Sequence, residues 1–200
     1  MQYSEHSSRF NVGLTTELAM YKGRHLHLLD MIFFPVADKG MYFALCFDTK
    51  RGKLFVLDSM VDVDEDGRMK EYERVSSLMR QLLVDYLNHA GEENRAKKAG
   101  KTKLHVVKLK WADGINKEDT GIYMMRHLET FMGDYGASWK CISVVSRAKQ
   151  LHVLRVRYGS TLVGWEQNKN GVAVKSEASE YYVTISQVEN FNANIMLIGS

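Results

Sequence analysis

The most specific chemical motif in the chain is a run of acidic residues at a spacing that suits calcium. Asp62, Asp64 and Asp66 precede Gly67 and then Glu73, which matches the pattern D-x-D-x-D-G-x5-E. In a calcium loop the carboxylates supply oxygen ligands and the glycine permits a sharp turn. Such a loop also needs a helix in front of it, whereas the residues just before Asp62 have the pattern of a strand. We therefore favour an acidic surface loop over a calcium site.

The histidines and cysteines do not form a recognisable site. His25 and His27 would share one face of a strand, but no third zinc ligand lies near them in the sequence. Cys46 and Cys141 stand apart without a C-x-x-C pair, so neither a metal site nor a disulfide scaffold is predicted. His127 fits a structural or surface role. Nucleotide-loop and serine-hydrolase motifs are absent, and we expect no cofactor.

Composition narrows the class of protein further. The 200 residues are 45% hydrophobic and 26% charged, which suits one folded domain with or without a tail. A net charge of +3 (27 minus 24) is too weak to indicate nucleic-acid binding. No apolar stretch approaches the roughly eighteen residues of a membrane span. The few cysteines and the polar start of the chain favour an intracellular compartment, cytoplasm or nucleus.

Three strands are predicted in the first half of the chain. Met31–Val36 is an apolar run that we expect to end at Pro35. Tyr42–Phe47 and Lys53–Leu57 flank the polar turn Asp48–Gly52, which predicts a hairpin. Because both runs are apolar on successive residues, we expect these strands to be covered on both faces.

Three helices are predicted from apolar residues at a spacing of three and four. The first is Met69–Asn88. The second is Thr120–Met132, with Thr120 as its N-cap, and the third is the basic segment Ser146–Val163.

The remaining segments have weaker patterns. We expect one short helix around Thr16–Lys22, a solvated loop over Glu92–Lys103 and an edge strand within Leu104–Trp111. Helical spacing is lost after Ser176, where only Tyr181–Ile185 and Ile195–Ile198 could be strands. The order of strands and helices predicts a single α/β or α+β domain.

The same order of elements resembles the SUMO-protease (ubiquitin-like-protein-specific) family of cysteine peptidases, most of all its plant, transposon-like branch. The resemblance covers residues 31–163 and rests on FFPV, YFALCFDTKRGKLFVLDSM, YERV, KLKW and DTGIYMMRHLETFMG. In that family one strand begins with His-Trp, the next ends in a catalytic Asp, and a helix opens with Asp-Cys-Gly. The resemblance implies a papain-like cysteine-peptidase fold with a mixed sheet flanked by helices.

The resemblance also implies that the catalytic positions have changed. Thr120 stands at the nucleophile, Met41 at the histidine and Tyr42 at the tryptophan, while Asp58 keeps the third catalytic position. No glutamine occurs between Leu104 and Asp119, where the family has its oxyanion donor. A methionine accepts no proton, and a threonine hydroxyl gains little from a helix N-terminus. These losses together imply an inactive peptidase.

The resemblance divides the chain into three parts. We expect a divergent segment over residues 1–30, a SUMO-protease-like domain over residues 31–175 and a divergent tail over residues 176–200. The family's helical portion ahead of the histidine strand is not recognisable in the forty residues before Met41. The expectation is therefore a degenerate copy, truncated at its N-terminus.

The predicted function is that of a pseudo-protease that binds another protein. Tyr42, Trp111 and Thr120 are the predicted binding residues, although the two aromatic residues could equally belong to the core. The partner could resemble SUMO or could be a second copy of the chain; a membrane or nucleic acid is not expected. The alternative is a residual or altered cysteine peptidase that uses Cys46 with His105 or His127.

Overall fold

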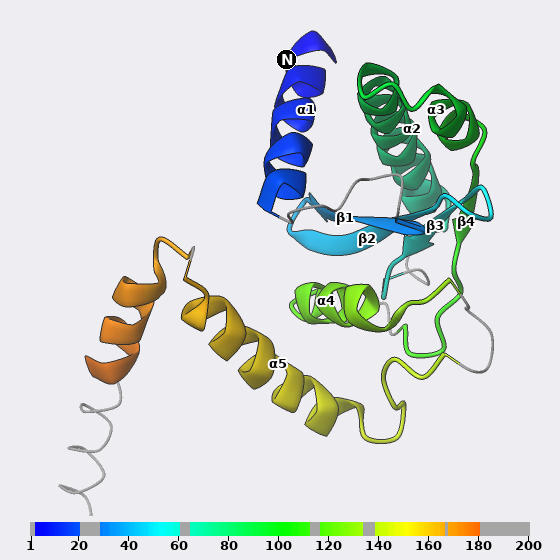
Figure 1. Cartoon of the computed structure of the whole chain (residues 1–200). Helices are drawn as coiled ribbons and strands as arrows, with labels where there is room; N and C mark the ends of the chain where they lie inside the picture. Colours follow the sequence, from blue (N-terminus) through cyan, green and yellow to red (C-terminus); the bar gives the residue numbers. More distant parts are fainter. Residues whose placement is uncertain are drawn as a thin grey trace, which may run out of the picture. The chain divides into compact units, whose positions relative to one another are not determined.

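The computed structural model describes residues 3–20, 29–60, 65–112, 117–133, 139–166 and 168–180, with only the backbone of residues 65 and 66. The chain forms two compact units, Met1–Arg147 and Ala148–Ser200 (Figure 1). The labelled elements are α1 (Tyr3–Met20), β1 (Met31–Asp38), β2 (Met41–Asp48), β3 (Lys53–Leu57), α2 (Glu65–His89), α3 (Glu93–Gly100), β4 (Lys103–Val106), α4 (Thr120–Thr130) and α5 (Arg147–Gly164).

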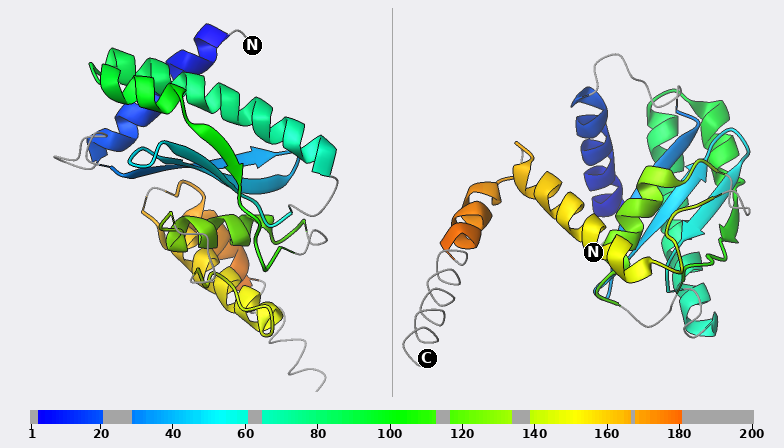
Figure 2. Two further views of the ribbon diagram at one scale, coloured as in Figure 1. Left: turned by 90° about the vertical axis from the view of Figure 1, so that its right-hand side faces the viewer. Right: turned by 90° about the horizontal axis from the view of Figure 1, so that it is seen from below.

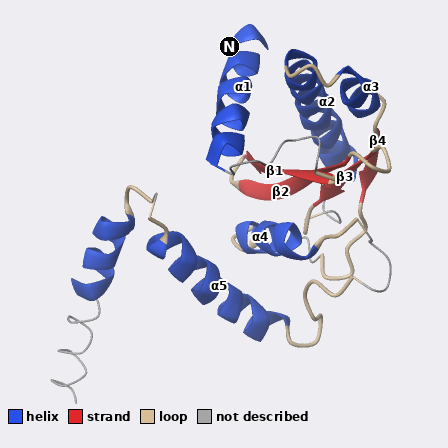
Figure 3. Ribbon diagram, viewed as in Figure 1, coloured by secondary structure: helices blue, strands red, loops and turns tan. Residues whose placement is uncertain are grey.

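The four strands form one mixed sheet in the order β1-β2-β3-β4 (Figure 3). β1 pairs antiparallel with β2, and β2 pairs antiparallel with β3, which confirms the predicted hairpin. β3 pairs parallel with β4. β1 continues to Asp38, so the prediction that it ends at Pro35 is wrong. Pro35 lies opposite Ala44 inside β1. An edge strand tolerates a residue without an N–H group.

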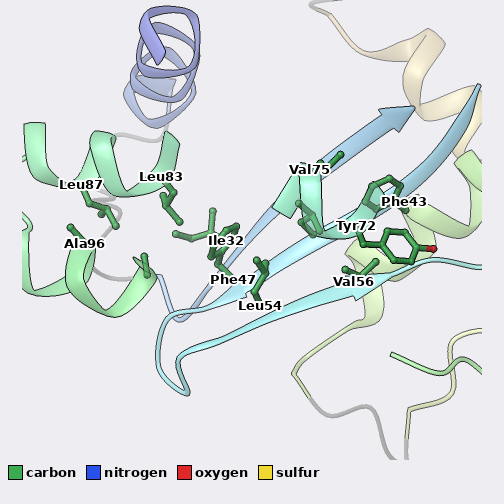
Figure 4. Packing of buried hydrophobic residues seen from close by; sticks show 12 residues of the cluster. Ile32, Phe43, Phe47, Leu54, Val56, Tyr72, Val75, Leu83, Leu87 and Ala96 are labelled. Atoms are coloured by element: carbon green, nitrogen blue, oxygen red, sulfur yellow. The ribbon is translucent and has the colours of Figure 1, made fainter. Parts of the chain in front are cut away.

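Helices cover both faces of this sheet. α1, α2 and α3 lie on one side and α4 lies on the other, as two views at right angles show (Figures 1 and 2). Residues 43–47 of β2 and residues 54–57 of β3 are all buried, so the predicted runs are covered on both faces except at their first residues, Tyr42 and Lys53. On the α2 side, Phe43, Phe47, Leu54 and Val56 pack with side chains of α2 and α3 (Figure 4). The fold is therefore α/β, with a mixed sheet flanked by helices.

Three helices differ from the sequence prediction, and one of them is α2, which begins at Glu65 rather than at Met69. Residues 93–100 form α3 rather than a solvated loop, and this helix buries Ala96 and Ala99. α1 is eighteen residues long and begins at Tyr3, well before the short helix predicted around Thr16–Lys22. The predicted edge strand is confirmed in part, since β4 is an edge strand but ends at Val106.

The second unit contains α5 and a further helix over residues 171–180. α5 agrees with its prediction, and it buries Leu151 and Leu154. Residues 176–180 are helical, contrary to the expected loss of helix after Ser176. The two strands predicted beyond residue 180 lie outside the described residues. Among the described residues, no helix has the length and apolar character that crossing a membrane requires.

Candidate functional site

The site lies where β2 begins and β3 ends. These strands pair antiparallel with Ala44 opposite Leu57. The start of β2 and the end of β3 therefore lie side by side where the strands end. Met41 opens β2 and Asp58 follows β3 directly. The fold therefore brings two of the three predicted catalytic positions to the same edge.

Asp58 is fully buried and accepts hydrogen bonds from three groups. The backbone N–H of Met60 donates to Oδ1 at 2.8 Å, and the Tyr72 hydroxyl donates to Oδ2 at 2.7 Å. The Arg68 guanidinium also donates to Oδ2 and forms an ion pair with the carboxylate. Each oxygen of the buried carboxylate thus has a partner, as a charge out of water requires.

Arg68, on the first turns of α2, connects Asp58 to Met41. Its Nη2 binds the Asp58 carboxylate, and its Nη1 lies 3.2 Å from the Met41 Sδ. Burial alone would lower the pKa of Arg68. The charge of Asp58 and the contact with Tyr72 raise the pKa by more than burial lowers it, so the pKa lies above its ordinary value. A permanently charged guanidinium therefore lies between the two family positions. Sequence reasoning missed this residue.

Thr120 lies at the start of α4, on the other face of the sheet, and is fully buried. The backbone N–H of Tyr42 donates to its Oγ1 at 3.2 Å, and the same hydroxyl donates to the carbonyl of Lys117 at 2.9 Å. The prediction that Thr120 is the N-cap is wrong. Asp119 occupies that position, without a side-chain hydrogen bond to the helix. The hydroxyl instead joins α4 to the start of β2.

The three predicted binding residues lie in different surroundings. Tyr42 is 43% exposed, and its ring covers the start of α4, since a Cβ built on Gly121 would lie 3.6 Å from the ring. Trp111 is 4% exposed and belongs to the core. Thr120 is completely buried. Of the three, Tyr42 alone presents its side chain to solvent.

Trp111 packs against a buried histidine, which is His127 on the inner face of α4. The Trp111 indole N–H donates to His127 Nε2 at 3.1 Å, and the Trp111 ring meets Trp139 edge-on at 4.8 Å. Burial lowers the pKa of His127 to about 3. His127 is therefore neutral at physiological pH and has a structural role, as the sequence suggested.

Neither cysteine has the surroundings of a reactive thiol. Cys46 is fully buried in β2, and burial followed by the charge of Asp48 raises its pKa to about 12. Burial raises the pKa of Cys141 to about 11. A catalytic cysteine needs the opposite shift, because the thiolate is the nucleophile. The His105 ring, one of the bases considered, packs against Phe55 with the ring centres 5.8 Å apart.

The calcium motif lies only partly within the described residues. Asp62 and Asp64 are outside them, as are His25 and His27, and Asp66 is described by its backbone only. α2 begins at Glu65, so Gly67 lies in a helix and not in the sharp turn of a calcium loop. Glu73 is exposed on α2. Within the described ranges, no cluster of three acidic, histidine or cysteine side chains is placed to hold a metal ion.

Comparison with protein families shows to which family the chain is similar. Residues 1–138 match the C-terminal catalytic domain of the Ulp1 protease family. No individual curated protein is significantly similar to the chain. The matched range includes residues 1–30 and every family position described above. Since the match covers more than half of the 200 residues, the chain belongs to the Ulp1 protease family, the SUMO-protease family of cysteine peptidases.

Proposed function

We propose that the chain is a catalytically inactive member of this family that acts by binding another protein. The observation that carries the proposal is the ion pair between Arg68 and Asp58. In an active member the aspartate orients the imidazole that takes the proton of the nucleophile. Here Met41 stands at the position of that histidine, and Arg68 occupies the carboxylate. Neither a thioether nor a guanidinium can take up a proton from a nucleophile.

The nucleophile position supports the same conclusion. A threonine can attack a carbonyl only if a neighbouring base removes its proton. The Thr120 hydroxyl proton points to the Lys117 carbonyl, its oxygen accepts from Tyr42, and the side chain is fully buried. It therefore connects α4 to β2 and does not face a substrate.

Cys46 and His127, two residues considered for an altered peptidase, do not have the properties of a nucleophile and a base. Cys46 is inaccessible and its pKa is raised to about 12. His127 uses Nε2 to accept the Trp111 N–H, and its pKa of about 3 makes it a poor base. Both groups belong to the core.

Tyr42 is the residue best suited to contact a partner near the former catalytic centre. Its backbone is held by Thr120 and its ring lies against Gly121, so a large aromatic side chain is exposed in a defined position. Rigid aromatic residues lose little entropy on binding and often dominate interface energies. The partner we propose is a protein, and SUMO-like proteins are the first candidates to test.

The test compares Tyr42→Ala with Tyr3→Ala. Both tyrosines are 43% exposed, but Tyr3 is on α1 and bonds to Asp85, away from the candidate site. Bait protein carrying each change is used to capture binding proteins from the source tissue, and the dissociation constants of those found with wild type are then measured.

Tyr42→Ala should weaken the interaction by more than about 2 kcal/mol while the melting temperature stays near that of wild type. Tyr3→Ala should keep full affinity. If both variants bind as tightly as wild type, the interface does not include Tyr42 at the former catalytic centre. If no protein is captured, the binding function is contradicted.

A further inference from the structure

The structure contains a cavity far from the candidate site, at the opposite end of the β2–β3 hairpin. Its volume is about 240 Å³. The lining comes from the residues before β1, the end of β2, the β2–β3 turn, α3 and the segment before β4: Leu29, Asp30, Phe47, Thr49, Lys50, Gly52, Arg95, Lys98, Ala99 and Thr102. Drug-sized ligands occupy roughly 300–1,000 Å³, so this cavity suits a smaller molecule.

Three cationic side chains and one carboxylate line the cavity. Lys50, Arg95 and Lys98 carry three positive charges and Asp30 one negative charge, which leaves +2 (3 minus 1). Lys50 forms an ion pair with Asp30, with 3.8 Å between Nζ and Oδ2. The Lys98 ammonium has no partner among the described residues. Among the residues that line the cavity, Asp30 is the one carboxylate, so the lining keeps this excess charge.

Arg95 is held in place at the cavity by its own hydrogen bonds. Its Nη2 donates to the Leu29 carbonyl at 2.9 Å and to the Thr49 hydroxyl at 3.0 Å, so the guanidinium joins α3 to the two segments that flank the hairpin end. Its Nε and Nη1 have no acceptor among the described residues. These N–H groups form a donor set that is already oriented before a ligand arrives.

The cavity also has an apolar part and no spare hydroxyl donor. Leu29, Phe47 and Ala99 contribute to its lining. The hydroxyl protons of Thr49 and Thr102 are used within the protein, on the carbonyls of Leu29 and Ala99. Among the side chains of the lining, the cations left to bind a ligand are therefore Arg95 and Lys98, next to an apolar surface, while Lys50 is paired with Asp30.

We infer that this cavity binds a small phosphate monoester. A phosphate group carries a charge of about −1.5 to −2 and three acceptor oxygens. That charge matches the excess of +2, and the oxygens match the guanidinium and ammonium donors. A carboxylate would supply one charge and two oxygens and would leave part of the donor set unused. The small organic group of the ester would lie against Leu29, Phe47 and Ala99.

The test uses phenyl phosphate, inorganic phosphate and benzoate at equal ionic strength, with binding measured by calorimetry on the full chain. Phenyl phosphate should bind, inorganic phosphate more weakly, and benzoate least. Lys98→Gln should raise the dissociation constant for phenyl phosphate about tenfold, the size expected for one charge-assisted hydrogen bond. Lys97→Gln is the matched control, because it makes the same change one residue earlier on α3 but does not line the cavity.

Arg95→Gln is the second variant, and its melting temperature is recorded because Arg95 also joins structural segments. A folded Arg95→Gln chain should lose phenyl phosphate binding. The proposal is overturned if wild type does not bind phenyl phosphate at millimolar concentration, or if Lys97→Gln and Lys98→Gln weaken binding equally. Benzoate binding as tightly as phenyl phosphate would overturn the assignment to phosphate.

Discussion

Asp58 forms an ion pair with Arg68, whereas in a working peptidase of this family the aspartate orients a histidine. The carboxylate is fully buried and neutralises a guanidinium instead of orienting an imidazole. A buried charge that loses its partner keeps the cost of leaving water without the attraction that offset it. We therefore expect this pair to matter for stability, and under the proposed function it takes no part in catalysis.

Replacing Arg68 with methionine should destabilise the fold by about 3 kcal/mol, because Asp58 would remain buried without its cation. Urea denaturation measures the free energy of unfolding. The control is Arg74→Met on the same helix, which removes an exposed pair with Glu71 and should change little. Equal stability of the two variants would contradict the structural role of Arg68.

His127 makes stability depend on pH. The unfolded chain protonates this histidine below about pH 6.5, whereas burial lowers its pKa to about 3 in the fold. The unfolded state therefore binds one more proton between these values, and the free energy of unfolding falls as the pH is lowered through this window.

In His127→Gln the side chain can still accept the Trp111 N–H but does not titrate. Its free energy of unfolding should depend less on pH than that of wild type, by up to about 1.4 kcal/mol per pH unit between pH 6 and pH 4. Parallel pH profiles of the two proteins would show that His127 is not held neutral.

At the scale of the elements, apolar periodicity predicted the parts of the fold that bury many large side chains. β2, β3, α2 and α4 were predicted because long apolar runs or stripes leave a clear pattern. α3 was missed because it buries only Ala96 and Ala99, which are separated by two lysines. α1 was underestimated because none of its residues is fully buried.

The candidate site was predicted only as far as the family resemblance reached. Met41, Asp58 and Thr120 could be placed because each lies at the end of a recognisable strand or helix. Arg68 could not be placed, since it precedes the helix predicted from Met69 and a charged residue there is typical of an exposed position. Only the packing of α2 against the end of β3 brings it to Asp58. The contact between Trp111 and His127 could not be predicted either, because the two residues are 16 positions apart and belong to different segments.

Calcium should leave the stability of the chain unchanged. A site saturated at one hundred times its dissociation constant would add about 2.7 kcal/mol. Gly67 is helical, however, and Glu73 is exposed on the same helix, so a calcium-loop geometry is not preformed. Melting curves at millimolar calcium and with a chelator should coincide. A chelator-reversible rise that Glu73→Gln abolishes would contradict this prediction.

At the scale of the whole molecule, the two proposed sites lie at opposite ends of the same hairpin. The candidate binding surface lies where β2 begins, and the charged cavity lies where β2 ends. The two sites share no residue, and their experiments use different variants. A negative result for phosphate binding would therefore leave the proposed function untouched. A negative result for protein binding would likewise leave the phosphate site untouched.

We propose that the fold of a cysteine peptidase persists in this chain without its catalysis. The most direct test incubates the purified chain with SUMO and ubiquitin carrying a C-terminal fluorophore, and with the matching vinyl-sulfone probes. Met41→His combined with Thr120→Cys is examined beside wild type. It should recover little activity, because Arg68 still holds Asp58 and the loss of an oxyanion donor costs about 3 kcal/mol.

We predict that wild type releases no fluorophore above background and forms no covalent adduct with either probe. The two thiols, Cys46 and Cys141, should stay unmodified because both are buried with raised pKa values. Fluorophore release, or a probe adduct on either cysteine that requires the ubiquitin-like part of the probe, would contradict the proposed loss of catalysis.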